Sequence, residues 1–256
     1  DVKRLMKTLR SDWLTTGPMV EKFEMAVAKY VGTRYAVAVA NGTAALHLAC
    51  LAAKIGLGDE VIAPTYSFVA SANCVLYCRG KPVLVDIDES SLCIDVKQVE
   101  KKINQRTKAI MGVDFGGRAA DWRSLRQLAK KYNLLLIDDA AHSFGAEYLG
   151  KKIGTQADMA CFSFHPVKTI TTGEGGMVVT NNKRWYERLM VLRTHGIVKL
   201  PESQPWYYEM RELGYNYRLT DLQCALGLEQ LKRDEKFLRR RRRLAMRYHR
   251  LLTGKP

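Results

Sequence analysis

The stretch SFHPVKTITTGEGG, Ser163 to Gly176, places a single lysine between two apolar runs. ACFSF (160–164) precedes the lysine and GGMVVT (175–180) follows it, and both runs have the composition of buried strands. A buried ammonium group is costly unless it is paired or neutralised. Lys168 therefore either reaches solvent or is held between the two strands for chemistry.

Working outward from this stretch, short apolar runs alternate with helix-period segments. The runs show no polar-out alternation, which indicates a sheet covered by helices on both faces and mostly parallel. Because only a turn-rich loop joins the last two runs, one of them should run antiparallel to the rest. We therefore predict an α/β fold with seven strands at 35–40, 60–63, 82–87, 107–114, 134–138, 160–164 and 175–180. The predicted helices between them are 43–54, 67–77, 95–103 and 121–132.

Beyond Asn181 the pattern becomes helical. Residues 182–196 predict one helix, and residues 219–252 predict a single long helix that begins at a Thr220 cap. The segment between them, 198–218, is rich in proline and tyrosine and is predicted to be irregular.

Composition indicates a globular protein, with 47% hydrophobic and 26% charged residues among 256. No apolar run approaches the roughly 18 residues of a membrane span, and no signal segment opens the chain. The six cysteines stand mostly in apolar runs, which fits a reducing compartment, so we expect a cytoplasmic protein without a membrane partner. Cys74 and Cys78 have the spacing of a metal pair, but no second pair or histidine accompanies them in the sequence, so we expect core cysteines and no metal.

The net charge is +15, and the run RRRRR at 239–243 is the most basic stretch of the chain. Such a run is typical either of a solvated helix or of a surface that binds nucleic acid or acidic ligands. No aromatic residue interleaves with the run and no nucleic-acid motif surrounds it. The solvated helix is the favoured interpretation, and we expect no nucleic-acid partner.

Polar residues follow several predicted strands, where ligands of open α/β sheets bind. ANGTAAL places Gly42 and Thr43 between a strand and a helix start, which is a suitable anion site. IDDAAH places Asp138 and Asp139 just past another strand, followed by His142. In isolation this acid pair is equally consistent with a metal site, a held base, a partner for a cationic ring nitrogen, or a cap.

Ser163 and Lys168 complete the set at the end of the next strand. A phosphate cradle, a carboxylate and a lysine on adjacent strand ends are what pyridoxal phosphate (PLP) requires. The lysine links covalently to the cofactor, the carboxylate keeps the pyridine nitrogen protonated, and the anion site holds the phosphate. A covalent role for Lys168 is thus the interpretation that the residues favour.

Several stretches resemble the DegT/DnrJ family of nucleotide-sugar aminotransferases over nearly the whole chain. They are DWLTTGPMVEKFE, YAVAVANGTAALHLA, GDEVIAPTYSFVASAN, IDDAAHSFGAEYLGKKIG, SFHPVKTITTGEGGMVVTN and ELGYNYRLTDLQCALGLEQL. The resemblance implies the fold of aspartate-aminotransferase-like enzymes, fold type I. It also implies PLP as cofactor, a homodimer with a shared active site, and amino transfer from glutamate to a nucleotide-linked keto sugar.

The resemblance also assigns roles to matching positions. Lys168 would carry the covalent link and move the proton, and Asp139 would face the pyridine nitrogen. Phe68 would stack on the ring, with His142 near its other face. Some relatives carry histidine at the position of Lys168 and perform a dehydration, so the lysine here favours transamination. The phosphate would be held by Gly42, Thr43 and Ser163.

Other positions would serve the substrate and the neighbouring subunit. Asn216 of GYNYR would reach the phosphate of the neighbouring subunit's cofactor, with Arg218 nearby. The sugar nucleotide would be bordered by Trp13, Leu14 and Thr15. Among sugar donors the resemblance favours a UDP-linked 4-keto-6-deoxy sugar on a route to cell-surface glycans such as lipopolysaccharide.

Family members run to well over three hundred residues and carry a small C-terminal domain. We therefore expect a large PLP-binding α/β domain over 1–215, and over 216–256 a long helix leading toward a small domain that this chain lacks. The alternative hypothesis is a catalytically incomplete protein of the same fold that binds PLP or a partner.

Overall fold

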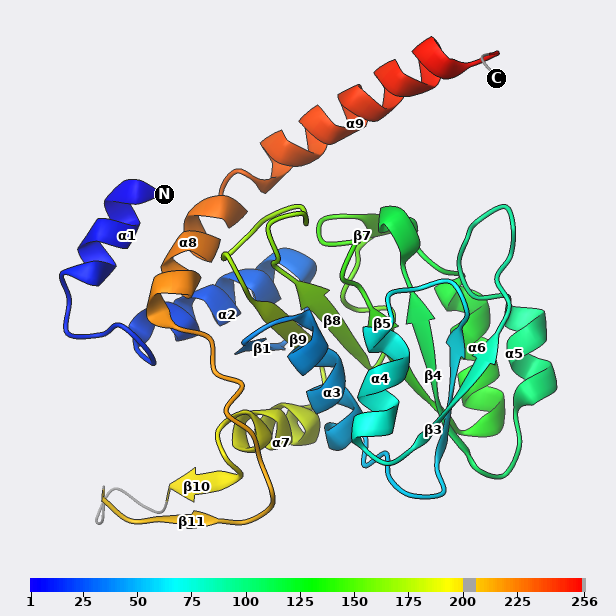
Figure 1. Cartoon of the computed structure of the whole chain (residues 1–256), viewed down its shortest axis with the longest axis horizontal. Coiled ribbons are helices and arrows are strands. Elements are labelled where there is room, and N and C mark those ends of the chain that lie inside the picture. The colour runs from blue at the N-terminus through cyan, green and yellow to red at the C-terminus, as the bar shows by residue number, and fades with distance from the viewer. Residues whose placement is uncertain (200–205, 255–256) are drawn as a thin grey trace.

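The computed structural model describes residues 1–199 and 206–254. Its centre is a seven-stranded sheet in the order β1-β9-β8-β5-β4-β2-β3 (Figure 1). Strand β9 pairs antiparallel with both β1 and β8, whereas the other pairs are parallel. The predicted α/β class, the seven strands and the single antiparallel strand are confirmed. The strands are β1 Tyr35–Val39, β2 Glu60–Pro64, β3 Lys81–Val85, β4 Thr107–Val113, β5 Leu135–Asp139, β8 Met159–Ser163 and β9 Gly176–Thr180.

Helices cover both faces of the sheet, because each strand is apolar on both sides. One hydrophobic cluster joins α2, α5 and α6 to one face of the sheet, and a second joins α3, α4 and α7 to the other. Along β1, Ala36 and Ala38 belong to the first cluster and Val37 and Val39 to the second. The helices are α2 Pro18–Val31, α3 Gly42–Ala52, α4 Ala70–Tyr77, α5 Val96–Lys102, α6 Trp122–Tyr132 and α7 Lys183–Arg193.

The single long helix predicted for 219–252 is wrong. The structure has two helices, α8 Asp221–Leu231 and α9 Asp234–Leu252, with Arg233 out of helical geometry between them at φ −109° and ψ 0°. The predicted start is confirmed, since Thr220 caps α8 in a capping box. At the break Asp234 is fully buried and accepts a hydrogen bond from the Tyr30 hydroxyl, which holds the start of α9 against α2.

The segment 198–218, predicted to be irregular, contains part of a short hairpin of β10 Ile197–Lys199 and β11 Tyr208–Met210; residues 200–205 of this segment lie outside the described part. Two further elements were not anticipated before residue 35: α1 Val2–Leu9 and the helix α2. A second small hairpin, β6 Glu147–Tyr148 and β7 Lys151–Lys152, follows β5.

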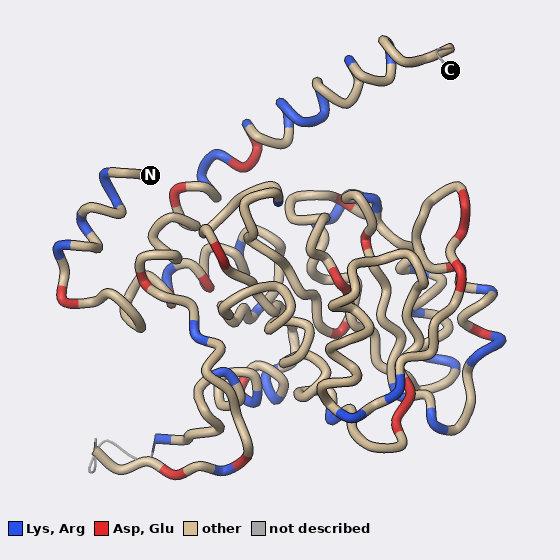
Figure 2. The backbone as a smooth tube through the Cα atoms, in the orientation of Figure 1, with Lys and Arg blue, Asp and Glu red and all other residues tan. Residues whose placement is uncertain are grey.

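The arginine run lies on α9, which extends away from the sheet layers (Figure 1) and carries a row of basic positions (Figure 2). Its residues 239–243 are all exposed, as the interpretation of a solvated helix requires. In the part of the chain that the structure covers, no helix combines the length and apolarity needed to cross a membrane.

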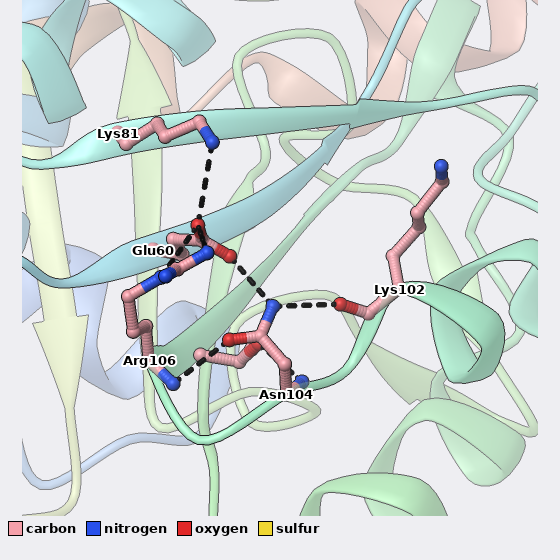
Figure 3. Close-up of polar contacts among 6 residues, drawn as sticks. Glu60, Lys81, Lys102, Asn104 and Arg106 are labelled. Carbon is pink, nitrogen blue, oxygen red and sulfur yellow. Dashed lines mark hydrogen bonds and ion pairs between the residues drawn. The ribbon is translucent and has the colours of Figure 1, made fainter.

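A polar cluster fixes the amino ends of β2, β3 and β4. It lies at the edge of the sheet opposite the carboxyl ends of β5 and β8, where Asp139 and Ser163 stand. The Glu60 carboxylate, 3% exposed, accepts hydrogen bonds from Asn104 at 2.7 Å and from Arg106 at 3.0 Å, and Lys81 lies at 3.4 Å (Figure 3). Since these partners come from β3 and from the turn before β4, the cluster joins three neighbouring strands.

Candidate active site

A cavity of about 610 Å³ opens at the carboxyl ends of β1, β4, β5 and β8. Its walls come from the start of α3, the start of α4 and the turns that follow the strands. This is the edge at which open α/β sheets bind ligands. Seven of the predicted site residues line it: Gly42, Thr43, Phe68, Asp139, His142, Ser163 and Lys168.

Lys168 stands on the turn after β8, where its N–H donates to the carbonyl of His165 at 2.9 Å. Its side chain is partly buried in the cavity wall, and in residues 1–199 and 206–254 no carboxylate forms an ion pair with it. Desolvation lowers the pKa of Lys168, and the charge of Asp139 opposes that change. Lowering the pKa increases the fraction of neutral amine, which is the nucleophilic form.

Asp139 ends β5 and is 4% exposed. Its Oδ2 accepts a hydrogen bond from the Ser71 hydroxyl at 2.6 Å, and its Oδ1 accepts one from the N–H of Ala141 at 3.2 Å. Burial raises the pKa of Asp139, whereas these two donors and the positive charge of Lys168 act in the opposite direction. A cationic N–H placed against this carboxylate would replace lost hydration and favour the ionised form.

His142 forms one wall of the cavity with an aromatic neighbour. Its Nδ1 accepts the N–H of Gly116 at 3.3 Å, so the neutral ring carries its proton on Nε2. Phe115 meets the imidazole edge-on at 5.6 Å and Tyr66 packs on Phe115 at 4.3 Å. Burial, followed by the charge of Lys168, lowers the pKa of His142, which keeps the ring neutral and suited to stacking.

The start of α3 has the features of an anion site. The first N–H groups of a helix have no acceptor within the helix, and the Asn41 side chain accepts only that of Ala44, at 2.8 Å. The N–H groups of Gly42 and Thr43 are therefore free at the N-terminus of α3, which is also the positive end of the helix dipole. Gly42 is required for close packing, because a Cβ there would lie 2.9 Å from the Cβ of Ser163.

Five predicted site residues do not line the cavity that this chain forms by itself. Trp13 and Leu14 are 56% and 43% exposed, and the carbonyl of Thr15 accepts the N–H of Asp221 at 2.5 Å at the start of α8. Asn216 is exposed and bridges to Thr194. The fifth, Arg218, is half-buried in the loop before α8. Their predicted roles toward substrate or a second subunit stay predictions.

Two contributors to the site escaped sequence reasoning. Ser71 orients Asp139 from α4, and it also accepts a hydrogen bond from Ser67 at 3.1 Å, one turn earlier. The available signal was the pair Ser67 and Ser71, four residues apart in the helix predicted for 67–77. The second contributor is Phe115, which lies in VDFGG two residues after Val113, the last residue of β4. The signal for it was an aromatic residue just past a strand end.

These residues fit PLP. The cofactor combines an anionic phosphate, a protonatable ring nitrogen and an aldehyde. The cavity offers unpaired N–H groups at the start of α3, a buried carboxylate in Asp139 and an amine of lowered pKa in Lys168. The volume of about 610 Å³ is also in the range of small-molecule sites.

Curated relatives share much of this sequence. The chain is 43% identical over 252 residues to the UDP-4-amino-4,6-dideoxy-N-acetyl-beta-L-altrosamine transaminase of Campylobacter jejuni, covering 97% of this chain and 65% of that protein. It is 43% identical over 238 residues to the GDP-perosamine synthase of Escherichia coli O157:H7, covering 93% and 64%. The chain thus spans just under two thirds of the length of these curated relatives.

Solved structures share the fold. PseC of Helicobacter pylori, an aminotransferase involved in the biosynthesis of pseudoaminic acid, superposes with a TM-score of 0.94 at 36% identity, over 100% of this chain and 68% of that one. NtdA of Bacillus subtilis, solved with bound cofactor PMP, gives 0.82 at 34% identity, over 90% and 52%. The model of one family matches residues 1–256. The cavity at the strand ends and these relatives agree with that match. The chain belongs to the DegT/DnrJ/EryC1/StrS aminotransferase family, whose enzymes depend on PLP.

Proposed function

We propose that the protein is a PLP-dependent aminotransferase that moves an amino group from glutamate to a nucleotide-linked 4-keto-6-deoxy sugar, with UDP as the favoured nucleotide. The observation that carries this function is the placement of Lys168, Asp139 and the start of α3 in one cavity. The names of the relatives support a sugar substrate, since they include a transaminase of a UDP-linked 4,6-dideoxy sugar and a GDP-perosamine synthase.

When bound, PLP supplies an electron sink for the bond changes at the amino-bearing carbon. Lys168 holds the cofactor covalently and moves the proton at its Nζ. Asp139 faces the ring nitrogen, and its hydrogen bond from Ser71 keeps the carboxylate in that orientation. His142 and Phe68 flank the ring. The phosphate is bound by Gly42, Thr43 and Ser163.

The remaining proposed parts lie outside the cavity. Asn216 reaches the phosphate of a neighbouring subunit's cofactor in a homodimer with a shared site, and Arg218 lies nearby. Residues 13–15 border the sugar nucleotide. Residues 1–215 form the PLP-binding domain, and 216–256 lead toward a small C-terminal domain. The enzyme acts in the cytoplasm, in the biosynthesis of cell-surface sugars such as those of lipopolysaccharide.

The test combines a chemical trap with turnover. After loading with PLP and reduction by borohydride, peptide mapping should find the cofactor mass on Lys168. Lys168→Ala should remain folded by circular dichroism, lack this adduct, and fall below about one thousandth of the parent's amino transfer from glutamate to a UDP-linked 4-keto-6-deoxy sugar. Lys3→Ala, which changes an exposed lysine on α1, serves as the matched control.

Retention of activity by Lys168→Ala, or an adduct at another lysine, would contradict the proposal. A panel of UDP-, dTDP- and GDP-linked keto sugars, each tested against the PMP form, assigns the substrate. The second candidate is a protein of this fold that binds PLP without turnover, and the position of residues 13–15 outside the cavity favours it. An adduct on Lys168 with no amino transfer to any sugar of the panel identifies that case.

A further inference from the structure

The loop that joins β8 to β9, residues 164–175, ends beside the start of α3. Gly176, the first residue of β9, pairs with Ser163 of β8. A Cβ on Gly176 would overlap the carbonyl oxygen of Asn41 and would lie 2.9 Å from the backbone nitrogen of Gly42. Because so little space separates these backbones, a shift of the loop end would also displace the start of α3.

Two side chains hold this loop end at one carbonyl group, that of Glu174. The Thr172 hydroxyl donates to it at 2.6 Å from within the loop, and Nε2 of Gln223 donates to it at 2.9 Å from α8. Glu174 itself stands in the cavity wall, whereas Gln223 is not among the residues that line the cavity. The end of the loop is therefore tied to a helix that lies outside the site.

The amide of Gln223 is fixed at both ends. Its Oε1 accepts the N–H of Thr220 at 3.1 Å in the capping box of α8, which leaves Nε2 for the carbonyl of Glu174. The two contacts agree on the orientation of the amide, since an N–H requires an acceptor and a carbonyl requires a donor. Gln223 cannot turn away from the loop without also losing the cap.

The start of α8 is itself a fixed base for this contact. Asp221, 1% exposed, accepts three backbone N–H groups at the start of α2, at 2.9, 3.1 and 3.1 Å. Two turns into α8, a Cβ on Gly227 would lie 2.6 Å from the ring of Phe23 on α2 and 2.8 Å from Cγ2 of Thr172. The helix thus packs closely against both α2 and the loop, and its position relative to the sheet is set by buried contacts.

We propose that Gln223 is a positioning residue for the anion site. Through the carbonyl of Glu174 it sets Gly176 against the start of α3. It thereby holds the N–H groups of Gly42 and Thr43 in the place where they receive the cofactor phosphate. The inference rests on the proposed function, in which the start of α3 binds that phosphate. A ligand without the phosphate should not depend on the contact.

The experiment compares PLP with pyridoxal, which lacks the phosphate. Brief borohydride trapping on Lys168, followed by peptide mapping over a range of ligand concentrations, gives a dissociation constant of the full chain for each. The ratio of the two constants, pyridoxal over PLP, measures what the phosphate contributes to binding. The parent chain should bind PLP more tightly than pyridoxal, because only PLP occupies the anion site.

Two variants share only the loss of the donor to Glu174. Gln223→Glu keeps an acceptor for the cap on Thr220 but adds a charge, whereas Gln223→Met adds no charge but lacks the acceptor. In both, the ratio should fall about tenfold, as when one charge-assisted hydrogen bond to the phosphate is lost, and pyridoxal should bind as in the parent. Circular dichroism checks that each variant is folded, and either one decides if the other is not.

Gln230→Glu and Gln230→Met are the matched controls. They make the same changes two turns later on α8, where the amide donates to Asp1 at 2.9 Å, and they should keep the parent ratio.

Three results would overturn the inference. The first is the parent ratio in the Gln223 variants, or a fall in only one of them, which would assign the effect to the charge or to the cap. The second is an equal weakening of PLP and pyridoxal, which would place the effect at Lys168. The third is the same fall in the Gln230 controls. Failure of the proposed function looks different, because the parent chain itself would then bind PLP no better than pyridoxal or would form no adduct on Lys168.

Discussion

At the scale of single residues, the two buried acids Asp139 and Asp114 have different roles. Asp139 faces the cavity, whereas Asp114 lies fully buried below it. Oδ1 of Asp114 accepts hydrogen bonds from the N–H of Ala120 and from Nε1 of Trp122, both at 2.9 Å, and its Oδ2 has no partner in the described residues. Asp114 thus holds the turn that begins at Phe115 and supports His142.

Asp114→Asn should change how stability depends on pH. Burial raises the pKa of Asp114 from 3.8 to about 6, so between these values the folded state binds more protons than the unfolded state. Its contribution to stability is present below pH 4 and is lost as pH rises through 6, by about 3 kcal/mol at most. The variant should lack this fall, as urea unfolding at pH 4 to 7 can measure.

Asp12→Asn, which changes an exposed acid, is the control and should keep the parent's pH profile. If Asp114→Asn followed the same curve as the parent protein between pH 4 and 6, the burial of the Asp114 charge would not be the source of the dependence.

At the scale of elements, the two ends of the sheet are built differently. The carboxyl ends carry the cavity, with N–H groups and titratable side chains left available for a ligand. The amino ends are closed by the Glu60 cluster, in which the carboxylate is saturated by partners from β3 and from the turn before β4 (Figure 3). Binding groups and stabilising groups are thus separated by the length of the strands.

Glu60→Gln should destabilise the fold without affecting the cavity. The amide cannot accept charge-assisted bonds from Arg106 and Lys81, while those two exposed cations can return to water, so we expect a loss of about 1–2 kcal/mol in the free energy of unfolding. Glu89→Gln changes an exposed acid on the loop that follows β3, at the other end of the strand, and should lie within about 0.5 kcal/mol of the parent. Equal denaturation midpoints for the two variants would show that the cluster contributes nothing.

At the scale of the whole molecule, α9 connects the last part of the chain to the lysine turn. Nη2 of Arg241 donates to the carbonyl of Lys168 at 2.7 Å, and Asp234 and Glu235 at the start of α9 contact Tyr30 and Lys152. One arginine of the run, Arg241, therefore has a structural contact, although the whole run is exposed on a projecting helix (Figure 2).

Arg241→Gln should loosen the lysine turn. An exposed hydrogen bond contributes about 0.5–1 kcal/mol, so amide hydrogen exchange of residues 166–172 should become about two- to fivefold faster. Arg242→Gln removes the same charge at the adjacent position and should leave the exchange of this segment unchanged. If the two variants gave the same exchange rates, the contact with Lys168 would be insignificant in solution.

The sequence by itself determined the α/β class, the seven strands, and the placement of Lys168, Asp139 and Gly42 at strand ends, because apolar runs and their flanking polar residues are local signals. It also supplied the family motifs. It did not predict the break before Asp234, since that depends on Tyr30, about two hundred residues away in the chain. The contact of Ser71 with Asp139 likewise required the fold.

The contact between α3 and α4 shows the same limit most clearly. Sequence spacing made Cys74 and Cys78 ordinary core cysteines, and all six cysteines are indeed buried. Only the packing of α3 against α4 brought the Sγ of Cys50 to 3.6 Å from the Sγ of Cys74. The chemical character of a side chain depends on neighbours within a few ångströms, and those neighbours come from segments whose proximity no local pattern encodes.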